Sequence, residues 1–186
     1  MSKTYAELDE SLAEFLRAQP VFFVGTAPLS SDGHVNVSPK GLDTLRVLGP
    51  NRVAYLDLTG SGIETVAHLK ENGRIVLMFC AFSGPPKIVR LYGKGRVVEP
   101  KDAEFGEFLT RFPAMDGARS IIVVEIERIA DSCGYAVPHM AKVSDRQQLA
   151  SWYRNRGEAG LVQYRQAKNR ESLDGLPGLD TATREG

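Results

Sequence analysis

The sequence predicts a mainly β protein with added helices (α+β), whose strands form a small antiparallel barrel. The apolar runs 21–27 and 34–39 are joined by "SSDG", and the runs 44–49 and 52–58 by "GPN". Short turns of this kind between β-rich runs indicate hairpins. The long run 88–100 contains two glycines, which are typical of bulges or bends at a barrel corner. No series of alternating strands and helices is present, which argues against a doubly wound parallel sheet.

The chain length and the charge balance limit which classes of function the protein can have. The 186 residues fit one domain with a C-terminal addition. Lys plus Arg and Asp plus Glu both number 23, so no overall field attracts nucleic acid or an anionic membrane. No stretch approaches the roughly 20 apolar residues of a membrane span. The N-terminus is polar and amphipathic, unlike a signal peptide. We therefore expect a cytoplasmic protein with no nucleic-acid or membrane partner.

The two cysteines, Cys80 and Cys133, stand apart in the sequence. They form no CxxC pair, and no histidine lies at a spacing suited to a shared metal. Cys80 falls within "IVLMFCAF" and reads as a small buried hydrophobe. We expect no metal site.

Helices and strands follow from the hydrophobic periodicity. A first helix over 5–18 has Leu8, Leu12, Phe15 and Leu16 on one face. After it we expect strands at 21–27, 34–39, 44–49 and 52–58, a helix at 61–71, strands at 74–82 and 88–100, a helix at 101–112 and a strand at 120–132.

The remainder reads as an extension of the barrel. A loop at 133–140 precedes a helix at 144–157 that Ser144 is placed to cap, then a short helix within 160–180 and an irregular tail. We divide the chain into a barrel over 1–140 and a C-terminal helical extension over 141–186, packed on the same domain.

The segment "TGSGIETVAHL", residues 59–69, admits two explanations. Ser61 and Glu64 have the S-x-x-E spacing of a capping box, which accounts for a helix start. A glycine-rich turn before a helix also presents free N–H groups to a phosphate. Thr59, Ser61 and Thr65 add hydroxyl donors, whereas Glu64 adds an opposing charge that the cations Lys40 and Arg90 are candidates to offset. Capping boxes are the commoner feature, so the local sequence alone favours the cap.

Three blocks in order carry a resemblance to a known family: "HVNVSPKG", "VAYLDLTGSGIETVAHLKENGRIVLMFCAF" and "KIVRLYGKGRVV". Over roughly residues 10–130 the chain resembles the pyridoxamine 5′-phosphate oxidase-like family of flavin-binding split barrels. The resemblance implies a six-stranded antiparallel split β-barrel with flanking helices and a helical C-terminal extension. It also implies FMN as cofactor, held at the interface of a homodimer.

The resemblance further implies which residues hold FMN. Backbone groups of 36–39 would meet the ring edge, Lys40 would reach the phosphate, and 57–59 would line the cleft. The phosphate-binding turn would fall on Ser61, Glu64 and Thr65, with Arg90 on a neighbouring strand. The expected cofactor-binding set is Asn36, Val37, Ser38, Pro39, Lys40, Asp57, Leu58, Thr59, Ser61, Glu64, Thr65 and Arg90.

The chain departs from the vitamin B6 oxidases of this family at two places. Those enzymes carry consecutive Arg and Lys residues at the phosphate turn, where this chain has Glu64 and Thr65. They also end in a Trp-Arg-x-His-type segment that grips the substrate, and this chain has no counterpart. We therefore expect a branch of the family distinct from the vitamin B6 oxidases, without pyridoxine 5′-phosphate oxidase activity.

FMN would supply the redox chemistry, so hydride transfer needs no side-chain acid or base, and we assign no catalytic residue. The loop "CGYAVPHM" supplies substrate-side candidates, Tyr135 and His139, although Tyr135 equally suits closing the barrel and His139 simple exposure. We expect an FMN-dependent oxidoreductase moving hydride or electrons between a donor such as NAD(P)H and a small organic acceptor. The alternatives are a non-catalytic flavin carrier or sensor, and a relative using F420 or haem in the same cleft.

Overall fold

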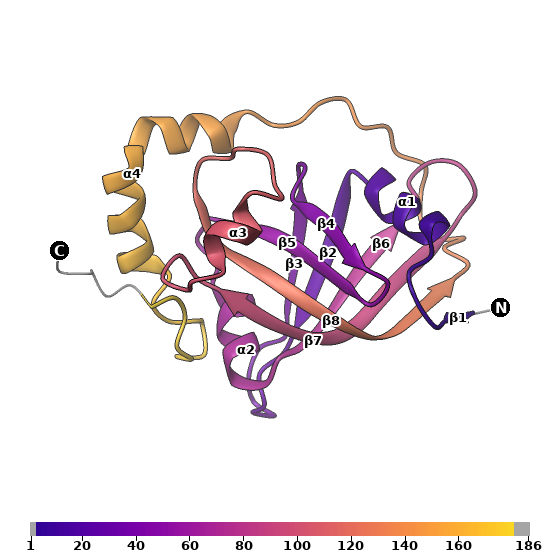
Figure 1. Ribbon diagram of the computed structural model, residues 1–186, viewed down its shortest axis with the longest axis horizontal. Helices are drawn as coiled ribbons and strands as arrows, with labels where there is room; N and C mark the ends of the chain where they lie inside the picture. The colour runs from indigo at the N-terminus through magenta and orange to yellow at the C-terminus, as the bar shows by residue number, and fades with distance from the viewer. Residues whose placement is uncertain (1–2, 181–186) are drawn as a thin grey trace.

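The computed structural model describes residues 3–180, which form a strongly curled antiparallel sheet with four helices around it (Figure 1). The strands are β1 (Thr4–Tyr5), β2 (Val21–Thr26), β3 (Asn36–Gly41), β4 (Leu45–Gly49), β5 (Arg52–Leu58), β6 (Arg74–Cys80), β7 (Ile88–Val98) and β8 (Ala118–Ser132). The helices are α1 (Glu10–Ala18), α2 (Glu64–Asn72), α3 (Phe105–Leu109) and α4 (Gln148–Lys168).

The strands follow the order β3-β2-β6-β7-β8-β5-β4, with β1 paired to β8, and every pairing is antiparallel. The expected fold, a mainly β split barrel with flanking helices, is confirmed. The strands outnumber the six expected, because seven lie along the path and β1 adds a short eighth within residues 3–180. The sheet ends at β3 and β4, so β3 and β5 are not hydrogen-bonded neighbours.

The expectation of a helix over 5–18 was wrong at its start. The Asp9 carboxylate accepts a hydrogen bond from the Leu12 N–H at 2.8 Å, so the helix begins at Glu10. Thr4 and Tyr5 instead pair with β8.

The expected capping box at Ser61 was also wrong. Helix α2 begins at Glu64 after Ile63, and its cap has no side-chain hydrogen bond. Ser61 is exposed in the preceding turn, whose carbonyl groups are bound elsewhere in the molecule.

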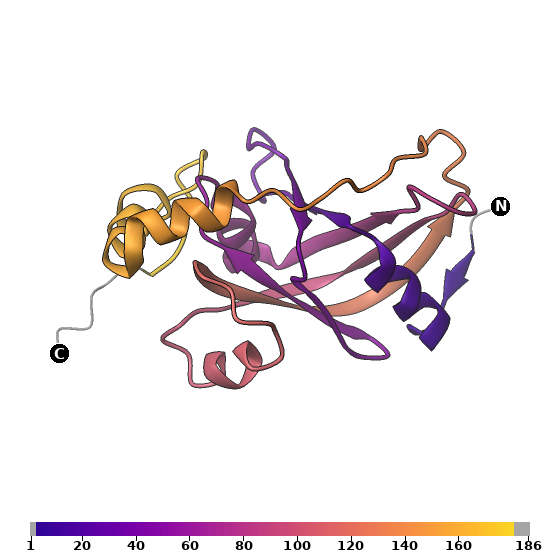
Figure 2. The same ribbon diagram turned by 90° about the horizontal axis from the view of Figure 1, so that it is seen from above.

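Two further helices differ in extent from the sequence expectation. The helix expected over 101–112 is reduced to the five residues of α3. The helix expected from Ser144 begins at Gln148, and it reaches Lys168 with a break at Gly157, where φ is 64°. In Figure 2 the connection 133–147, most of whose residues are exposed, runs along the side of the sheet opposite α3 before it reaches α4.

A bulge lies beside Gly93 of the long strand, but its extra residue, Glu127, is on β8, because Tyr92 pairs with Arg128 and Gly93 with Ile126. The register of β7 on β8 shifts between Tyr92 and Gly93. A Cβ atom at Gly93 would lie 2.0 Å from the Glu125 carbonyl oxygen, so only glycine permits this approach. The bulge helps the long strands bend around the core.

Two hydrophobic clusters hold the fold together. The larger fills the inside of the curled sheet, with Phe22, Tyr55 and Phe79 in ring contact at its centre. The smaller lies between β5, β8 and the α3 region and includes Leu56, Ile121 and Phe112. Burial on both faces of β5 and β8 explains their nearly continuous apolar sequences.

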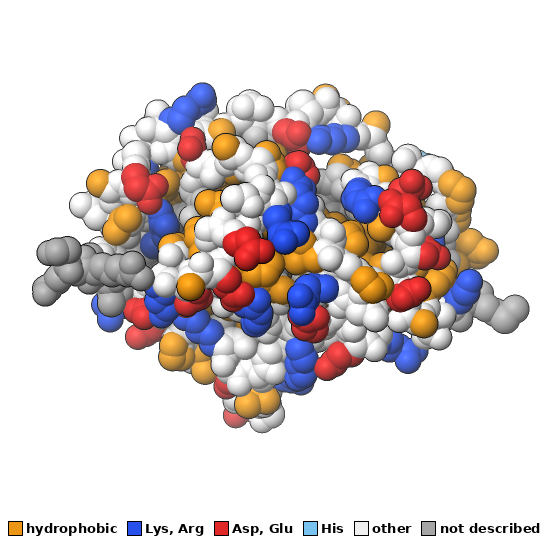
Figure 3. All heavy atoms as spheres, viewed as in Figure 1, with side chains coloured by type: hydrophobic (Ala, Val, Ile, Leu, Met, Phe, Trp, Pro, Cys, Tyr) orange, Lys and Arg blue, Asp and Glu red, His pale blue; other side chains and the backbone are white. Residues whose placement is uncertain are grey.

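The surface carries mixed charge. On the face seen in Figure 3, Lys and Arg side chains are interspersed with Asp and Glu. Within residues 3–180 no helix is long and apolar enough to cross a membrane. The same residues contain no group of three or more His, Cys, Asp or Glu side chains that could hold a metal ion.

Candidate functional site

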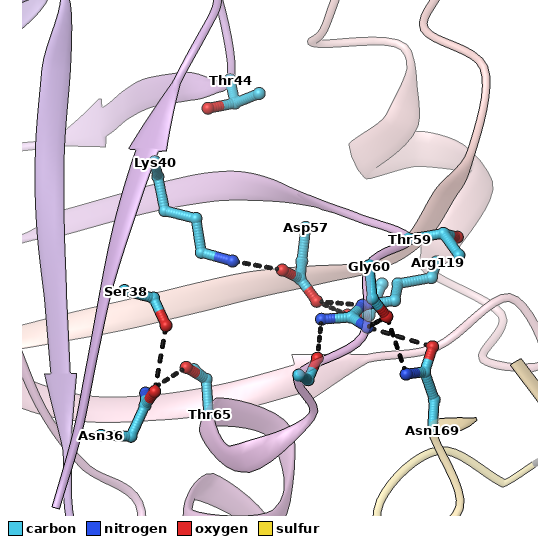
Figure 4. A network of polar contacts seen from close by, with 12 residues as sticks. Asn36, Ser38, Lys40, Thr44, Asp57, Thr59, Gly60, Thr65, Arg119 and Asn169 are labelled. Carbon is cyan, nitrogen blue, oxygen red and sulfur yellow. Dashed lines mark hydrogen bonds and ion pairs between the residues drawn. The ribbon is translucent and has the colours of Figure 1, made fainter. Parts of the chain in front are cut away.

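A buried ion pair joins the two sides of the split in the barrel. The Lys40 ammonium on β3 lies 2.8 Å from Asp57 Oδ1 on β5, and Asp57 is 1% exposed (Figure 4). Alternation along β3 directs Asn36, Ser38 and Lys40 inward, because each pairs with an inward residue of β2. The fold thus brings Lys40 and Asp57, two of the expected site residues, into direct contact.

Asp57 has a second cationic partner, Arg119, at the start of β8. Arg119 Nε donates to Asp57 Oδ2 at 2.7 Å, and the Ser120 hydroxyl lies 3.3 Å from the same oxygen. Burial alone would raise the pKa of Asp57, but the charges and hydrogen bonds of Arg119 and Lys40 outweigh it and hold this pKa well below its usual range. Two cations facing one carboxylate leave a net positive charge in this buried region.

Arg119 also holds the turn before α2. Its terminal nitrogens donate to the Gly60 carbonyl at 3.1 Å and to the Gly62 carbonyl at 2.7 Å. The Asn169 side chain, from the C-terminal extension, donates to the Gly60 carbonyl at 2.9 Å. The Tyr153 hydroxyl donates to the Thr59 carbonyl at 2.7 Å. The carbonyls of this turn are therefore bound from the side of β8 and the extension.

The direction of these carbonyls fixes the direction of the turn's N–H groups. In a planar trans peptide the N–H points opposite to the C=O of the same unit. Carbonyls held toward Arg119 and the extension therefore leave the N–H groups of 60–63 facing the other way. Within residues 3–180 these four N–H groups have no hydrogen-bond partner. Successive free N–H groups next to a helix N-terminus form the kind of concavity that binds anions.

Glu64 introduces a negative charge at this turn. A Cβ atom at Gly62 would lie 2.8 Å from Glu64 Oε2, so the carboxylate lies beside the turn. Its other oxygen accepts from the Leu173 N–H at 3.4 Å. The tail thus holds Glu64, and Arg119 supplies a compensating positive charge beneath the turn.

A second set of polar side chains surrounds Asn36. Its amide nitrogen donates to Thr65 Oγ1 at 3.0 Å, and Ser38 donates to its amide oxygen at 3.0 Å (Figure 4). The same amide nitrogen donates to Thr26 Oγ1 at 3.1 Å. Thr26 lies 3.0 Å from Nδ1 of His68, a side chain that is fully buried. Burial lowers the pKa of His68, so this histidine is neutral at pH 7. The Asn36 amide is held in one orientation.

The other expected cofactor-binding residues lie in three places. Thr59 is buried, where its hydroxyl donates to the Gly117 carbonyl at 2.7 Å. Leu58 packs in the smaller hydrophobic cluster. Val37, Pro39 and Arg90 lie on the outer face of the sheet, since Pro39 and Arg90 share a cross-strand row with Phe23 and Met78. Arg90 there donates to the Ser132 hydroxyl at 3.0 Å.

Tyr135 and His139 are both exposed and follow the C-terminal end of β8. Within residues 3–180 neither side chain forms a hydrogen bond or ion pair with Lys40, Asp57 or Arg119. Their assignment to the substrate side stays a prediction.

Sequence reasoning missed Arg119, Tyr153 and Asn169. The sequence does contain a signal for Arg119, which stands at the edge of the apolar run "SIIVVEI". A charged residue beside such a run needs a buried partner, and Asp57 in "VAYLDL" has the same need. Tyr153 and Asn169 left none, since each stands in a polar helical or tail segment and meets the turn only through tertiary packing.

Comparisons with known proteins agree with the fold and the order of its elements. The family model of pyridoxamine 5′-phosphate oxidase matches residues 8–133. The pyridoxamine 5′-phosphate oxidase family protein ustO of Aspergillus flavus is 40% identical over 200 residues, covering 97% of this chain and 79% of that protein.

Two solved structures show the same fold at low sequence identity. HupZ from Group A Streptococcus has a TM-score of 0.52 at 18% identity, covering 66% of this chain and 91% of that chain. A candidate pyridoxamine 5′-phosphate oxidase from Lactobacillus delbrueckii has a TM-score of 0.52 at 21% identity, covering 68% and 98%.

Proposed function

The chain belongs to the pyridoxamine 5′-phosphate oxidase family, and from that premise we propose that it is an FMN-binding oxidoreductase. The proposed reaction moves hydride or electrons between a reduced donor such as NAD(P)H and a small organic acceptor. The relatives that carry the family name support the flavin, and the geometry around residues 59–64 supports its phosphate.

The observation that carries the proposal is the set of free N–H groups at 60–63. Arg119 lies directly behind this turn, 5% exposed, and adds a positive charge to the N-terminal end of α2. Consecutive Arg and Lys residues are absent from the turn, and Arg119 and Lys40 are cations from other elements that can replace their charge. A flavin phosphate fits this donor set.

The inward side chains and the free backbone edge of β3 suit the flavin ring and the ribityl chain. β3 is an edge strand, so one side of its backbone is free to meet the polar edge of a flavin ring. The fixed amide of Asn36 and the hydroxyl of Thr65 stand between this strand and α2. Bound FMN would accept and return two electrons as hydride. The chain's own part is to orient the cofactor and exclude water, and we assign no side chain to proton transfer.

We propose a homodimer that covers the outer face of β3, β2, β6 and β7. A cross-strand row there consists of Val37, Gly25, Val76 and Tyr92, and Val37 is 66% exposed. The next row, from Pro39 to Arg90, is also largely apolar. A contiguous apolar area on a sheet marks an interaction surface. It would place Val37, Pro39 and Arg90 at the interface.

The cytoplasmic location stays a prediction from the sequence. Cys80 and Cys133 are free thiols, with Cys80 buried as expected and Cys133 exposed. Free thiols suit a reducing compartment.

The cofactor is tested by titrating the purified apoprotein with FMN and following the flavin fluorescence. Binding of FMN in preference to F420 and haem supports the proposal. Preferential binding of F420 or haem contradicts it and supports the alternative relative that uses the same cleft.

Turnover is tested separately on the FMN-loaded protein. Anaerobic bleaching of the flavin absorbance by NADPH, followed by reoxidation with an organic acceptor such as a quinone, is the expected result. A protein that binds FMN tightly but is neither reduced by NADPH or NADH nor reoxidised by such an acceptor would instead be a flavin carrier or sensor.

A further inference from the structure

We propose that the C-terminal extension completes the phosphate-binding turn, with Asn169 and Tyr153 as its positioning residues. This inference rests on the proposed function, because the phosphate concerned is that of the flavin. It assigns a role to a part of the chain that lies outside the family match at residues 8–133.

Both ends of the Asn169 side-chain amide are hydrogen-bonded, the nitrogen to the turn before α2 and the oxygen to Arg119. Its side-chain nitrogen donates to the Gly60 carbonyl at 2.9 Å and lies 3.5 Å from the Ser61 carbonyl. Its side-chain oxygen accepts from Arg119 at 3.1 Å, and the residue is fully buried. Asn169 therefore fixes two carbonyls of the turn and the guanidinium that binds the same turn (Figure 4).

Tyr153 fixes the start of the turn. Its hydroxyl donates to the Thr59 carbonyl at 2.7 Å, and the residue is 4% exposed. Its ring packs on Gly117, where φ is 76° and a Cβ atom would lie 2.5 Å from the ring. The Gly117 carbonyl in turn accepts from both the N–H and the hydroxyl of Thr59. Thr59 is held on one side by Gly117, the residue before β8, and on the other by α4.

The tail beyond Asn169 also controls the charge at the turn. The Leu173 N–H binds the Glu64 carboxylate. Asp174 accepts from the His34 N–H at 2.8 Å and contacts its ring at 2.6 Å, which ties the tail to the loop between β2 and β3. The extension thus holds one oxygen of the Glu64 carboxylate, while the other oxygen lies beside Gly62.

One polar chain connects these contacts to the barrel. Asn169 binds Arg119, Arg119 binds Asp57, and Asp57 binds Lys40. Loss of Asn169 removes a side-chain acceptor from Arg119 and a donor from the turn at once. The N–H groups of 60–63 then lose their fixed direction. We expect this loss to weaken binding of the phosphate and to leave binding of the flavin ring unchanged.

Comparing FMN with riboflavin separates a positioning role of Asn169 and Tyr153 from a general structural role. Riboflavin carries the same ring and ribityl chain as FMN but has no phosphate, so the ratio of the two dissociation constants reports the phosphate contact alone. A variant that only loosens the fold weakens both ligands together. A variant that disturbs the turn changes the ratio.

The experiment compares the wild-type full-length chain with Asn169→Ala and Tyr153→Phe, using flavin fluorescence titration with FMN and with riboflavin. Tyr153→Phe keeps the ring on Gly117 and removes only the hydroxyl, so it remains informative if Asn169→Ala does not fold. Asn155→Ala is the matched control, because Asn155 is exposed on α4. Thermal unfolding of each variant is measured in parallel.

We expect Asn169→Ala to lower FMN affinity by roughly tenfold or more, as for a lost hydrogen bond to a charged group, with riboflavin affinity within about twofold of wild type. Tyr153→Phe should move the ratio the same way by a smaller factor, and Asn155→Ala should leave it unchanged. An unchanged ratio in the folded variants, with a wild type that prefers FMN, overturns the positioning role only. A wild type that binds neither ligand overturns the proposed function itself, and the inference with it.

Discussion

Asp57 is the residue on which the polar contacts of the site converge. It lies at the end of an apolar strand, is almost fully buried, and is bound by one cation from each side. A buried carboxylate with two cationic partners is strongly coupled to both, so removing its charge leaves Lys40 and Arg119 unpaired. The sequence identified Asp57 and Lys40 as site residues from a family resemblance, but it assigned Lys40 to a phosphate and did not foresee their direct contact.

The low pKa of Asp57 predicts how stability depends on pH. A carboxyl whose folded pKa lies below its unfolded value of about 3.9 stabilises the fold above that value and loses this contribution as the pH falls toward the folded pKa. Asp57→Asn should therefore cost roughly 3–5 kcal/mol at pH 7. The difference from wild type should shrink between pH 5 and pH 3. Urea unfolding across this pH series measures it, and a constant difference would contradict the assignment.

Lys40 is predicted to contribute positive charge to the bound phosphate as well as to Asp57. Lys40→Ala should weaken FMN binding by roughly tenfold, because a charged donor is lost from a partly buried site. The matched control is Lys142→Ala, which removes an exposed lysine paired with Asp145. Equal FMN affinity in the two variants would exclude Lys40 from the phosphate site.

Among the elements, strands were the most predictable and helix ends the least. The strand expected over 52–58 matches β5 to the residue, because its apolar run is bounded by turn residues on both sides. The start of α2 was misplaced, because Arg119 and Asn169 bind the turn carbonyls that a local cap would have left free. Those partners lie more than 50 positions along the chain, so no local pattern reports them.

The bulge of β8 opposite Gly93 of β7 gives a test on a single pair of strands. Gly93→Ala would force a Cβ atom onto the Glu125 carbonyl at 2.0 Å. We expect a loss of about 3 kcal/mol or more in the free energy of unfolding, since neither backbone can move without breaking the ladder. Gly106→Ala in α3 is the matched control, because a Cβ atom there meets nothing within 4 Å. It should change stability by less than about 1 kcal/mol. Equal effects in denaturant unfolding would mean that the bulge is not constrained.

At the scale of the whole molecule, the curled sheet separates an inner polar site from an outer apolar face. The overall fold followed from hairpin signals, glycine positions and three ordered sequence blocks. The grouping of the site residues did not follow from the sequence. Alternation along β3 directs Asn36, Ser38 and Lys40 inward and Val37 and Pro39 outward. Periodicity predicts that neighbours face opposite ways, but only the pairing partners show which side is the core.

The outer face yields a prediction about assembly. Val37→Lys places a charge in the exposed apolar row of β3 and should convert a dimer into a monomer, because burying an unpaired charge at an interface is costly. Val162→Lys, on α4 at 38% exposure, is the matched control and should remain dimeric. Sedimentation equilibrium measures both. A monomeric wild type, or a dimeric Val37→Lys variant, would contradict this interface.

The proposed binding of the flavin phosphate by the N–H groups at the start of α2 can be measured at those groups themselves. The measurement is amide hydrogen exchange, followed residue by residue with and without saturating FMN. FMN should slow exchange at residues 60–66, where the turn and the first turn of the helix carry free N–H groups, and riboflavin should slow it far less. Saturation with FMN that leaves exchange at 60–66 unchanged would exclude phosphate binding at this turn.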